Sequence, residues 1–358
     1  MTTDDKYWAN YDGLQHAKHA ILMRYLGGWF PKLTSAYSHV LYIDCHAGRG
    51  KHDTGEYGSP IIALKGLLNH RSLNRILNNS QVNFIFFEKD EKNYNILQNE
   101  IKACGKPPDR VNILTYCSDY EPELHEICEK LRAKDEQLAP CFAFLDPFGF
   151  GLSMDLMNML LSFPRSELFI NFMFRYVDMA IRNETQEENM NRLFGTQMWK
   201  NARTINDYSE REQFILNIFS SKLSAKYITP MQMLSSTNTT KYVLIHATNH
   251  QSGRDLMKQA VWSVSPEGYF AASEKDDPNQ LILLKTDPDL FPLKRKLLQI
   301  FRKQTVSIQE LHHWLRGEIY LDKHLHMILR ELRDNGEVIF QNYEGRFAFK
   351  KNPDVKFL

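Results

Sequence analysis

The chain has 358 residues, of which 43% are apolar and 24% are charged, and its formal net charge is +1. This composition is typical of a packed globular protein of two or three domains. No apolar run reaches the roughly 18 residues of a membrane-spanning helix, and residues 1–5 lack the pattern of a secretory signal. The five cysteines include no C-x-x-C pair, which argues against a zinc finger and predicts reduced thiols in the cytoplasm.

The first 174 residues alternate between helical and strand-like patterns. Apolar periodicity predicts a helix over residues 14–30 that stops at Pro31. Five short apolar runs that follow are predicted to be strands, over residues 39–44, 82–87, 111–116, 141–145 and 168–174. Because helix-like stretches separate these runs, we expect an α/β fold with a parallel, Rossmann-like sheet that is covered on both faces.

The middle of the chain is predicted to extend this sheet. Residues 178–235 are polar and helical in character, which indicates a helical insertion after the fifth strand. Further strands are predicted over 242–248 and 281–285, and a linker over 287–289. These patterns assign residues 1–286 to one domain and 291–358 to a second.

The second domain has the pattern of a winged helix-turn-helix. A basic amphipathic helix is predicted over 291–304, and Ser307 with Glu310 forms a capping box that opens a second helix. Asp322 is a candidate cap for a third helix, which Gly336 ends. Apolar residues 338–340 and 347–349 flank a turn and predict a hairpin.

The charge and the histidines of this domain carry weaker signals. Residues 291–358 hold 13 Lys and Arg against 8 Asp and Glu, a net charge of +5. This excess is compatible with nucleic-acid binding and equally with a solvated surface. Histidines gather in the same region without companion cysteines, so we expect surface residues and no metal site; they are His312, His313, His324 and His326.

A candidate ligand site follows the first predicted strand. The residues Asp44, Gly48 and Gly50 form the pattern D-x-x-x-G-x-G. Ligands of doubly wound sheets bind at the carboxyl ends of the strands, where glycines allow close approach. The spacing differs from G-x-G-x-x-G, so a dinucleotide pyrophosphate is not the expected ligand. Taken alone, the pattern is also that of an ordinary turn.

Two further acids follow the next two strands. Glu88 after the second strand could accept both hydroxyls of a ribose. Asp119 after the third could accept a hydrogen bond from an adenine amine. Each acid alone is equally a loop residue or a helix cap. Together with Asp44 they predict a site for an adenine ligand with a ribose and no phosphate chain, which S-adenosylmethionine (SAM) matches better than NAD or ATP.

The fourth strand ends in Asp146-Pro147-Phe148-Gly149. The acid or its backbone carbonyl would face the ligand, and Phe148 would stand beside it. An enzyme that methylates an exocyclic amine needs an acceptor for the amine's hydrogens and a flat surface for the base. We therefore predict that Asp146 and Phe148 are catalytic. The alternative is a plain turn with Phe148 in the core.

Several segments together resemble the three-Cys-motif partner protein family, which is methyltransferase-like and is named for a neighbouring partner protein. The resemblance rests on residues 42–50 and 58–64, with support from 17–22, 247–248 and 257–262. It covers nearly the whole chain. It implies a C-terminal winged helix and a three-Cys-motif protein as a partner.

The front half is also similar to the large-subunit ribosomal RNA adenine-N6 methyltransferases. That similarity implies catalysis at Asp146 and a set of SAM contacts: Lys18, His46, Ser59, Glu88 and Asp119. Those enzymes have Asp-Pro-Pro-Tyr at the catalytic turn, whereas Asp-Pro-Phe-Gly here is closer to the tRNA guanine-N2 dimethyltransferases. The target base is therefore left open. A basic face of the first helix, with His16, Lys18, His19 and Arg24, would suit a phosphate backbone.

Three functions are compatible with these patterns. The leading hypothesis is a SAM-dependent methyltransferase that acts on an exocyclic amino group of a nucleic-acid base, in RNA rather than DNA. The second is a SAM-binding or degenerate module that recognises nucleic acid or a partner protein without methyl transfer. The third is a metal-dependent nuclease with Asp44, Glu88 and Asp146 as ligands, which the absence of a D-x-D pair disfavours.

Overall fold

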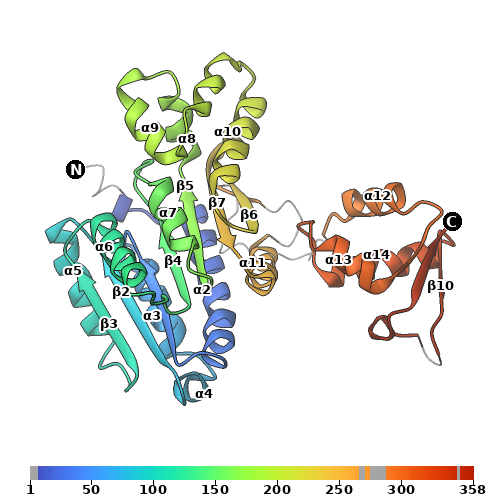
Figure 1. Ribbon diagram of the computed structural model, residues 1–358, viewed down its shortest axis with the longest axis horizontal. Coiled ribbons are helices and arrows are strands. Elements are labelled where there is room, and N and C mark those ends of the chain that lie inside the picture. Colours follow the sequence, from blue (N-terminus) through green and yellow to red (C-terminus); the bar gives the residue numbers. More distant parts are fainter. Residues whose placement is uncertain (1–6, 266–270, 275–287, 345–346) are drawn as a thin grey trace. The chain divides into compact units, whose positions relative to one another are not determined.

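A computed structural model describes residues 7–265, 271–274, 288–344 and 347–358 (Figure 1). Contacts divide the chain into two units, one formed by Met1–Ala260 with Ala271–Gln280 and the other by Val261–Phe270 with Leu281–Leu358. Within the described ranges, every helix is too short or too polar to cross a membrane.

The first unit is built on one eight-stranded sheet. Its strands are β1 (His39–Asp44), β2 (Gln81–Phe87), β3 (Val111–Tyr116), β4 (Cys141–Leu145), β5 (Ser166–Phe172), β6 (Tyr227–Leu234), β7 (Thr240–Thr248) and β8 (Ala271–Ser273). They lie in the order β3-β2-β1-β4-β5-β7-β6-β8. Strands β1 to β5 are mutually parallel, whereas β7 is antiparallel to both neighbours. The predicted α/β class with a Rossmann-like, mostly parallel sheet is confirmed.

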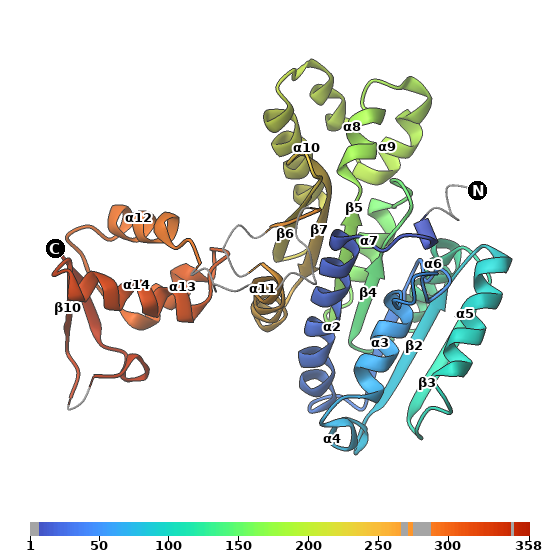
Figure 2. The same ribbon diagram turned by 180° about the vertical axis from the view of Figure 1, so that it is seen from behind.

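Helices cover both faces of this sheet. They are α2 (Gly13–Thr34), α3 (Ser59–Leu68), α4 (Leu73–Leu77), α5 (Glu91–Ala103), α6 (Tyr120–Ala133), α7 (Met154–Leu161) and α11 (Gln251–Val264). Figure 2 shows α2 and α3 on one face, and Figure 1 shows α6 and α7 on the other. Every residue of β4 and β5 is buried, which explains why these strands are apolar without alternation.

Helix α2 does not stop at Pro31 but continues to Thr34, so the predicted end was wrong. Proline has no amide hydrogen and leaves the carbonyl of the residue four positions earlier without its helical partner. Here that carbonyl belongs to Gly27, and the His70 imidazole donates to it from Nε2 at 3.0 Å. The helix therefore keeps its hydrogen bonding through the proline, and Trp29 and Phe30 stay in the core.

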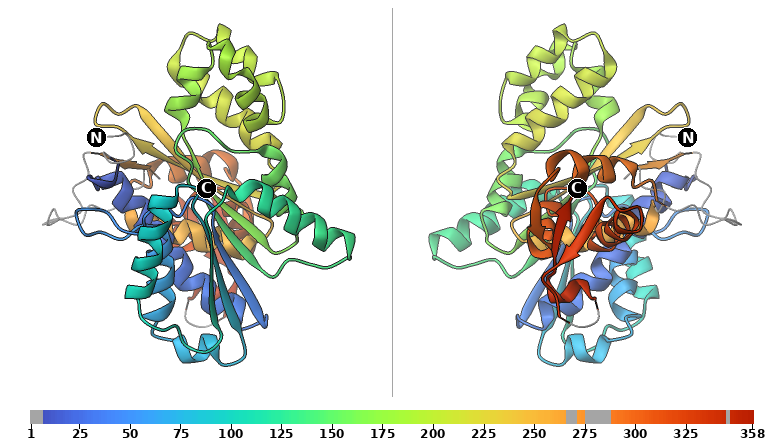
Figure 3. Two further views of the ribbon diagram at one scale, coloured as in Figure 1. Left: turned by 90° about the vertical axis from the view of Figure 1, so that its left-hand side faces the viewer. Right: turned by 90° about the vertical axis from the view of Figure 1, so that its right-hand side faces the viewer.

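The predicted insertion is helical only in part. Its helical elements are α8 (Phe174–Ala180), η1 (Glu184–Gln186), α9 (Glu187–Phe194), η2 (Met198–Thr204) and α10 (Tyr208–Lys222). Figures 1 and 3 show them as a lobe at one end of the sheet. Residues 227–234 form strand β6 instead, because Thr229, Met231 and Met233 alternate into the core. The strand predicted over 281–285 lies outside the described residues.

The second unit contains three helices and a small antiparallel sheet. Its elements are α12 (Phe291–Ile300), β9 (Thr305–Ser307), α13 (Ile308–Leu315), α14 (Asp322–Asp334), β10 (Val338–Gln341), η3 (Phe349–Lys351) and β11 (Asp354–Phe357). Strand β11 lies between β10 and β9. The predicted capping box of Ser307 and Glu310 is confirmed.

Three local predictions in this unit were wrong. The partner of β10 is β11 rather than residues 347–349, because Val355 and Phe357 fill the core while Phe347 packs on Phe340 with ring centroids 4.5 Å apart. Asp322 is the first residue of α14, and Leu321 precedes it as the cap. His324 is buried against Trp262 rather than exposed, with centroids 4.2 Å apart.

Candidate functional site

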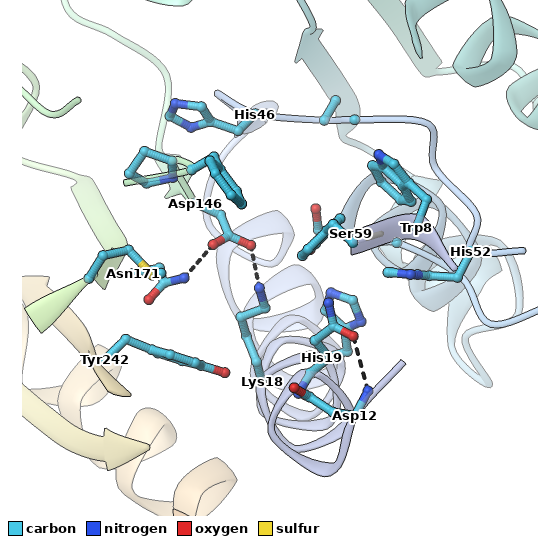
Figure 4. A pocket seen from close by; sticks show the side chains of 18 of the residues that line it. Trp8, Asp12, Lys18, His19, His46, His52, Ser59, Asp146, Asn171 and Tyr242 are labelled. Carbon is cyan, nitrogen blue, oxygen red and sulfur yellow. Dashed lines mark hydrogen bonds and ion pairs between the residues drawn. The ribbon is translucent and has the colours of Figure 1, made fainter. Parts of the chain in front are cut away.

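A cavity of about 860 Å³ opens where the carboxyl ends of β1, β2, β4 and β5 meet (Figure 4). Seven of the predicted site residues line it: Lys18, His46, Gly48, Ser59, Glu88, Asp146 and Phe148. A second cavity of about 230 Å³ adjoins it and includes Asp119. His46, Glu88, Pro147 and Phe148 line both cavities, so the two form one continuous cleft.

The loop after β1 brings the backbone close to the N-terminal segment. Gly48 has φ +61°, and a Cβ there would lie 2.4 Å from Cζ2 of Trp8, so the indole ring occupies the space of a side chain. The Gly48 amide donates to Glu88 Oε2 at 2.9 Å. The glycine therefore joins Trp8, the β1 loop and the acid after β2 in one wall of the cavity.

Two predicted residues line neither cavity in the described part of the chain. Gly50 packs inward, where a Cβ would lie 2.9 Å from the Leu97 side chain. Asp44 is fully buried and accepts hydrogen bonds from the His46 amide at 3.2 Å and the Tyr42 hydroxyl at 3.3 Å. Burial raises the pKa of Asp44 to about 7, against the opposing effect of hydrogen bonds from Ser59 and His46. Asp44 thus positions two residues that do line the cavity.

The centre of the site is a buried ion pair between Lys18 and Asp146. Lys18 projects from α2, and its Nζ contacts Oδ2 of Asp146, just beyond β4. The other carboxylate oxygen, Oδ1, accepts a hydrogen bond from Nδ2 of Asn171 at 2.5 Å. Burial by itself would lower the pKa of Lys18, but the charge and hydrogen bond of Asp146, together with Tyr7 and Tyr242, outweigh burial and raise that pKa well above its ordinary value. The ammonium group therefore remains charged.

The predicted exposed basic face of the first helix is wrong. Lys18 and His19 are both buried, because this side of α2 faces the cavity rather than solvent. His19 is held by a 3.0 Å hydrogen bond between its Nδ1 and the Tyr11 hydroxyl. This side of the helix belongs to the pocket and offers no cationic surface to a phosphate backbone.

Phe148 is accessible rather than part of the core. Its side chain is 65% exposed at the mouth of the larger cavity. Tyr176 lies beside it, with ring centroids 6.0 Å apart, and Met179 is 70% exposed on the same rim. The cation of Arg175 also lines this rim. The alternative in which Phe148 fills the core is excluded.

Asp119 has a structural role as a helix cap, and its predicted contact with a cofactor stays a prediction. It caps α6, where its Oδ1 accepts the Glu121 amide at 3.0 Å. It also lines the smaller cavity with Tyr120 and Arg192. A cap and a ligand contact are compatible, since a carboxylate has several lone pairs.

Within the part of the chain that the structure describes, no three His, Cys, Asp or Glu residues converge as a metal site would require. The nuclease hypothesis needs Asp44, Glu88 and Asp146 to converge in that way, and it has no support from this geometry.

Three residues that complete the site were not predicted: Trp8, Asn171 and Tyr242. Asn171 had a signal in the sequence, since it is the one polar residue in the apolar run 168–174. Tyr242 begins the apolar segment 242–248, whose pattern predicts a strand and nothing about a site. Trp8 precedes the first predicted helix and gave no signal.

Comparisons with known proteins leave the family open. No protein-family model and no curated protein matches the chain. Similar solved structures include protein LPL1258 from Legionella pneumophila, with 14% identity over 68% of this chain and 91% of that chain and a TM-score of 0.38. MnmC2 from Aquifex aeolicus has 10% identity over 62% of this chain and 56% of its own, with a TM-score of 0.31. At these TM-scores neither likeness bears on function.

The order of the strands in the sheet assigns the fold more firmly than these similarities do. The order β3-β2-β1-β4-β5 of parallel strands is that of a doubly wound, Rossmann-like sheet, which the antiparallel β7 extends. The chain therefore has a Rossmann-like fold. A fold alone does not identify a substrate, so the reaction has to be argued from the site.

The ion pair leads to a prediction about stability. Replacement of Lys18 by Met leaves Asp146 buried without a cation, and we expect the free energy of unfolding to fall by about 3–5 kcal/mol in urea denaturation. Lys241→Met is the control. Lys241 also lines the cavity, but its side chain is 31% exposed to solvent in its pairs with Asp12 and Glu274, so a loss of about 1 kcal/mol or less is expected. Equal losses in the two variants would contradict a dominant buried pair.

The burial of Asp44 leads to a prediction about pH. Its pKa rises on folding from 3.8 to about 7, so the folded state binds this proton more tightly than the unfolded state. The stabilisation is complete below about pH 4 and is lost as the pH rises through 7. We expect Asp44→Asn to gain stability relative to the wild type between pH 5 and pH 8, as measured by thermal unfolding without ligand. A pH-independent difference would show that Asp44 is ionised throughout this range.

Proposed function

We propose that this protein is a SAM-dependent methyltransferase that acts on an exocyclic amino group of a nucleic-acid base, in RNA rather than DNA. One observation carries the proposal: Asp146, paired with Lys18 at the end of β4, lies in the same cavity as the exposed ring of Phe148. This arrangement combines an acceptor for amine hydrogens with an aromatic surface for a base.

The residues of the cleft fit an adenine nucleoside cofactor. Asp119 in the smaller cavity and Glu88, which lines both cavities, would hold adenine and ribose. Two buried atoms at the smaller cavity, Nδ1 of His46 and Oγ of Ser118, have no hydrogen-bond partner in the described part of the chain. Since buried polar atoms are nearly always paired, these two are available for a ligand. Gly48 and Ser59 would face the amino-acid end of SAM.

The chain's own residues would position the acceptor. When bound, SAM supplies an electrophilic methyl group on its sulfonium. Asp146 or the Pro147 carbonyl would accept one of the amine's hydrogens, which helps to point the nitrogen lone pair at the methyl carbon. Asp146, held in place by its contact with Lys18, would help to stabilise the positive charge that develops on the nitrogen. The amine then loses one proton to solvent.

The rim of the cavity supports a nucleic-acid substrate. Phe148, Tyr176 and Met179 are exposed there beside Arg175. Exposed aromatic rings next to a cation are the usual means of holding single-stranded nucleic acid, because bases stack on the rings while the cation meets the phosphate. The same features would also accommodate an unpaired base in RNA.

We further propose that the second unit is a winged helix-turn-helix that binds the nucleic acid or a three-Cys-motif partner protein. Its element order, α12-β9-α13-α14-β10-β11, supports this topology. Its net charge of +5 favours a nucleic acid. Contact would be made by α14 and the segment after β10.

One observation favours the alternative of a recognition module without methyl transfer. Both oxygens of Asp146 already accept hydrogen bonds from protein groups, Lys18 and Asn171. A carboxylate has about four lone-pair positions, so an amine can still be accommodated. The methyltransferase and the recognition module differ in whether the protein transfers a methyl group at all.

Cofactor binding provides the first test of this function. We expect Glu88→Ala to weaken SAM binding by about 1.5–3 kcal/mol in calorimetry, the range for a hydrogen bond to a charged group. Glu91→Ala is the control, because Glu91 begins α5 three residues further on and lines neither cavity. Unchanged affinity in Glu88→Ala would remove this carboxylate from the cofactor site.

Methyl transfer provides the second test. RNA and DNA incubated with the protein and SAM should yield methylated nucleosides by mass analysis. Phe148→Ala should keep the wild-type melting temperature, since the ring is exposed, and weaken substrate binding by about 1–3 kcal/mol, the contribution of one stacked base. Met198→Ala, which is 53% exposed and away from the cavity, should change neither quantity. A wild type that transfers no methyl group to either nucleic acid would favour the recognition module.

A further inference from the structure

Asn171 and Tyr242 are two buried polar residues of the larger cavity that the chemistry above does not use. Their side chains are 4% and 5% exposed, and both line the cavity. The Oδ1 atom of Asn171 and the hydroxyl of Tyr242 have no hydrogen-bond partner among the described residues. Buried polar atoms without partners are rare, so both atoms point to a ligand that completes them.

The two residues belong to neighbouring strands on the acceptor side of the cavity. Strands β5 and β7 pair directly, with Asn171 opposite Leu244, two positions from Tyr242. In Figure 4 both side chains extend from these strands toward the region of Lys18. The predicted cofactor residues follow β1, β2 and β3 on the other side of β4. Asn171 and Tyr242 are therefore placed to contact the methyl acceptor.

The hydrogen-bonding role of each atom is determined by its surroundings. Asp146 accepts from Nδ2 of Asn171, and a rotated amide would place its oxygen against that carboxylate. The free Oδ1, in a residue that lines the cavity, is therefore an acceptor. Burial raises the pKa of Tyr242 well above its ordinary value, so the hydroxyl keeps its proton and can donate.

We propose that Asn171 and Tyr242 together recognise an amidine edge, an amino group next to a ring nitrogen that carries a lone pair. The proposal rests on the function above and narrows its substrate to adenine or cytosine. Asn171 Oδ1 accepts one hydrogen of the amine, and the Tyr242 hydroxyl donates to the ring nitrogen. Adenine presents this pair at N6 and N1, and cytosine at N4 and N3.

Guanine forms a poorer set of hydrogen bonds with Asn171 Oδ1 and the Tyr242 hydroxyl. On its pairing edge the amino group lies next to N1–H, which is a donor, so the Tyr242 hydroxyl hydrogen would be left without an acceptor. The other neighbour of the amino group, N3, carries a lone pair but lies on the edge beside the ribose, where the sugar obstructs the approach of both side chains. A site that is built to hydrogen-bond a group discriminates strongly against an analogue that leaves its polar atoms unpaired. In this arrangement Asp146 is also a positioning residue for Asn171, whose amide it holds.

The test measures binding of nucleosides to the full chain saturated with S-adenosylhomocysteine, so that the cofactor site is filled. The probes are adenosine, cytidine, guanosine, purine riboside without the amine, and 1-deazaadenosine without the ring nitrogen, each followed by ligand-detected NMR. We expect adenosine to bind about three- to tenfold more tightly than purine riboside or 1-deazaadenosine, which corresponds to one hydrogen bond.

Single substitutions assign the two contacts. Tyr242→Phe should remove the preference for adenosine over 1-deazaadenosine, and Asn171→Leu should remove the preference for adenosine over purine riboside. Tyr242→Phe should keep the wild-type melting temperature, because its hydroxyl has no partner in the described residues to lose. Tyr208→Phe is the matched control. It removes a hydrogen bond to the Thr240 carbonyl outside the cavity and should leave all five affinities unchanged.

Several results would overturn the proposal. These are binding of none of the nucleosides, equal or tighter binding of guanosine, persistence of the 1-deazaadenosine preference in Tyr242→Phe, or a clear fall in its melting temperature. Methyl transfer to guanine in RNA would refute the amidine edge and leave the proposed function intact. Adenosine selectivity without any methyl transfer would support the recognition pair and refute the transferase.

Discussion

The ion pair between Lys18 and Asp146 is the interaction on which the site depends. An unpaired charge is too costly to bury, so Asp146 can lie at the end of β4 only if α2 brings its ammonium group there. The pair thereby places the N-terminal turns of α2 at the carboxyl edge of the sheet, where they form one wall of the cavity. Asn171 completes the arrangement from β5, so that three separate elements converge on one carboxylate.

A second buried polar cluster holds the same helix further along. Glu167 at the start of β5 accepts from the Tyr25 hydroxyl of α2 and lies 3.0 Å from Nε2 of His246 in β7. Polar contacts therefore link α2 to both ends of β5, directly through Glu167 at its start and through Asp146 to Asn171 near its end. Because hydrogen bonds are directional and apolar packing is not, these two clusters determine the position of the helix more closely than its apolar contacts can.

This anchoring divides the cleft into two halves of different chemistry. The loops after β1, β2 and β3 provide acids and backbone amides that suit a nucleoside cofactor. The ends of β5 and β7, with the start of the helical lobe, provide an amide, a phenol and an exposed aromatic rim. Asp146 lies between the halves, where a transferred group would pass from one to the other.

The sequence alone determined the α/β class, the strands β1 to β5 and the place of most predicted site residues, because local periodicity and the parallel arrangement bring strand-end residues to one edge. Only the tertiary structure decided which residues complete one another. The continuation of α2 through Pro31 depends on the hydrogen bond from His70 to the Gly27 carbonyl, between residues 43 positions apart in the chain. Lys18 and Asp146 lie 128 residues apart, so no spacing rule reveals their pairing. Asn171 and Tyr242 appear as strand residues until the fold leaves one polar atom of each without a partner, because satisfaction of a buried atom is a property of its neighbours in space.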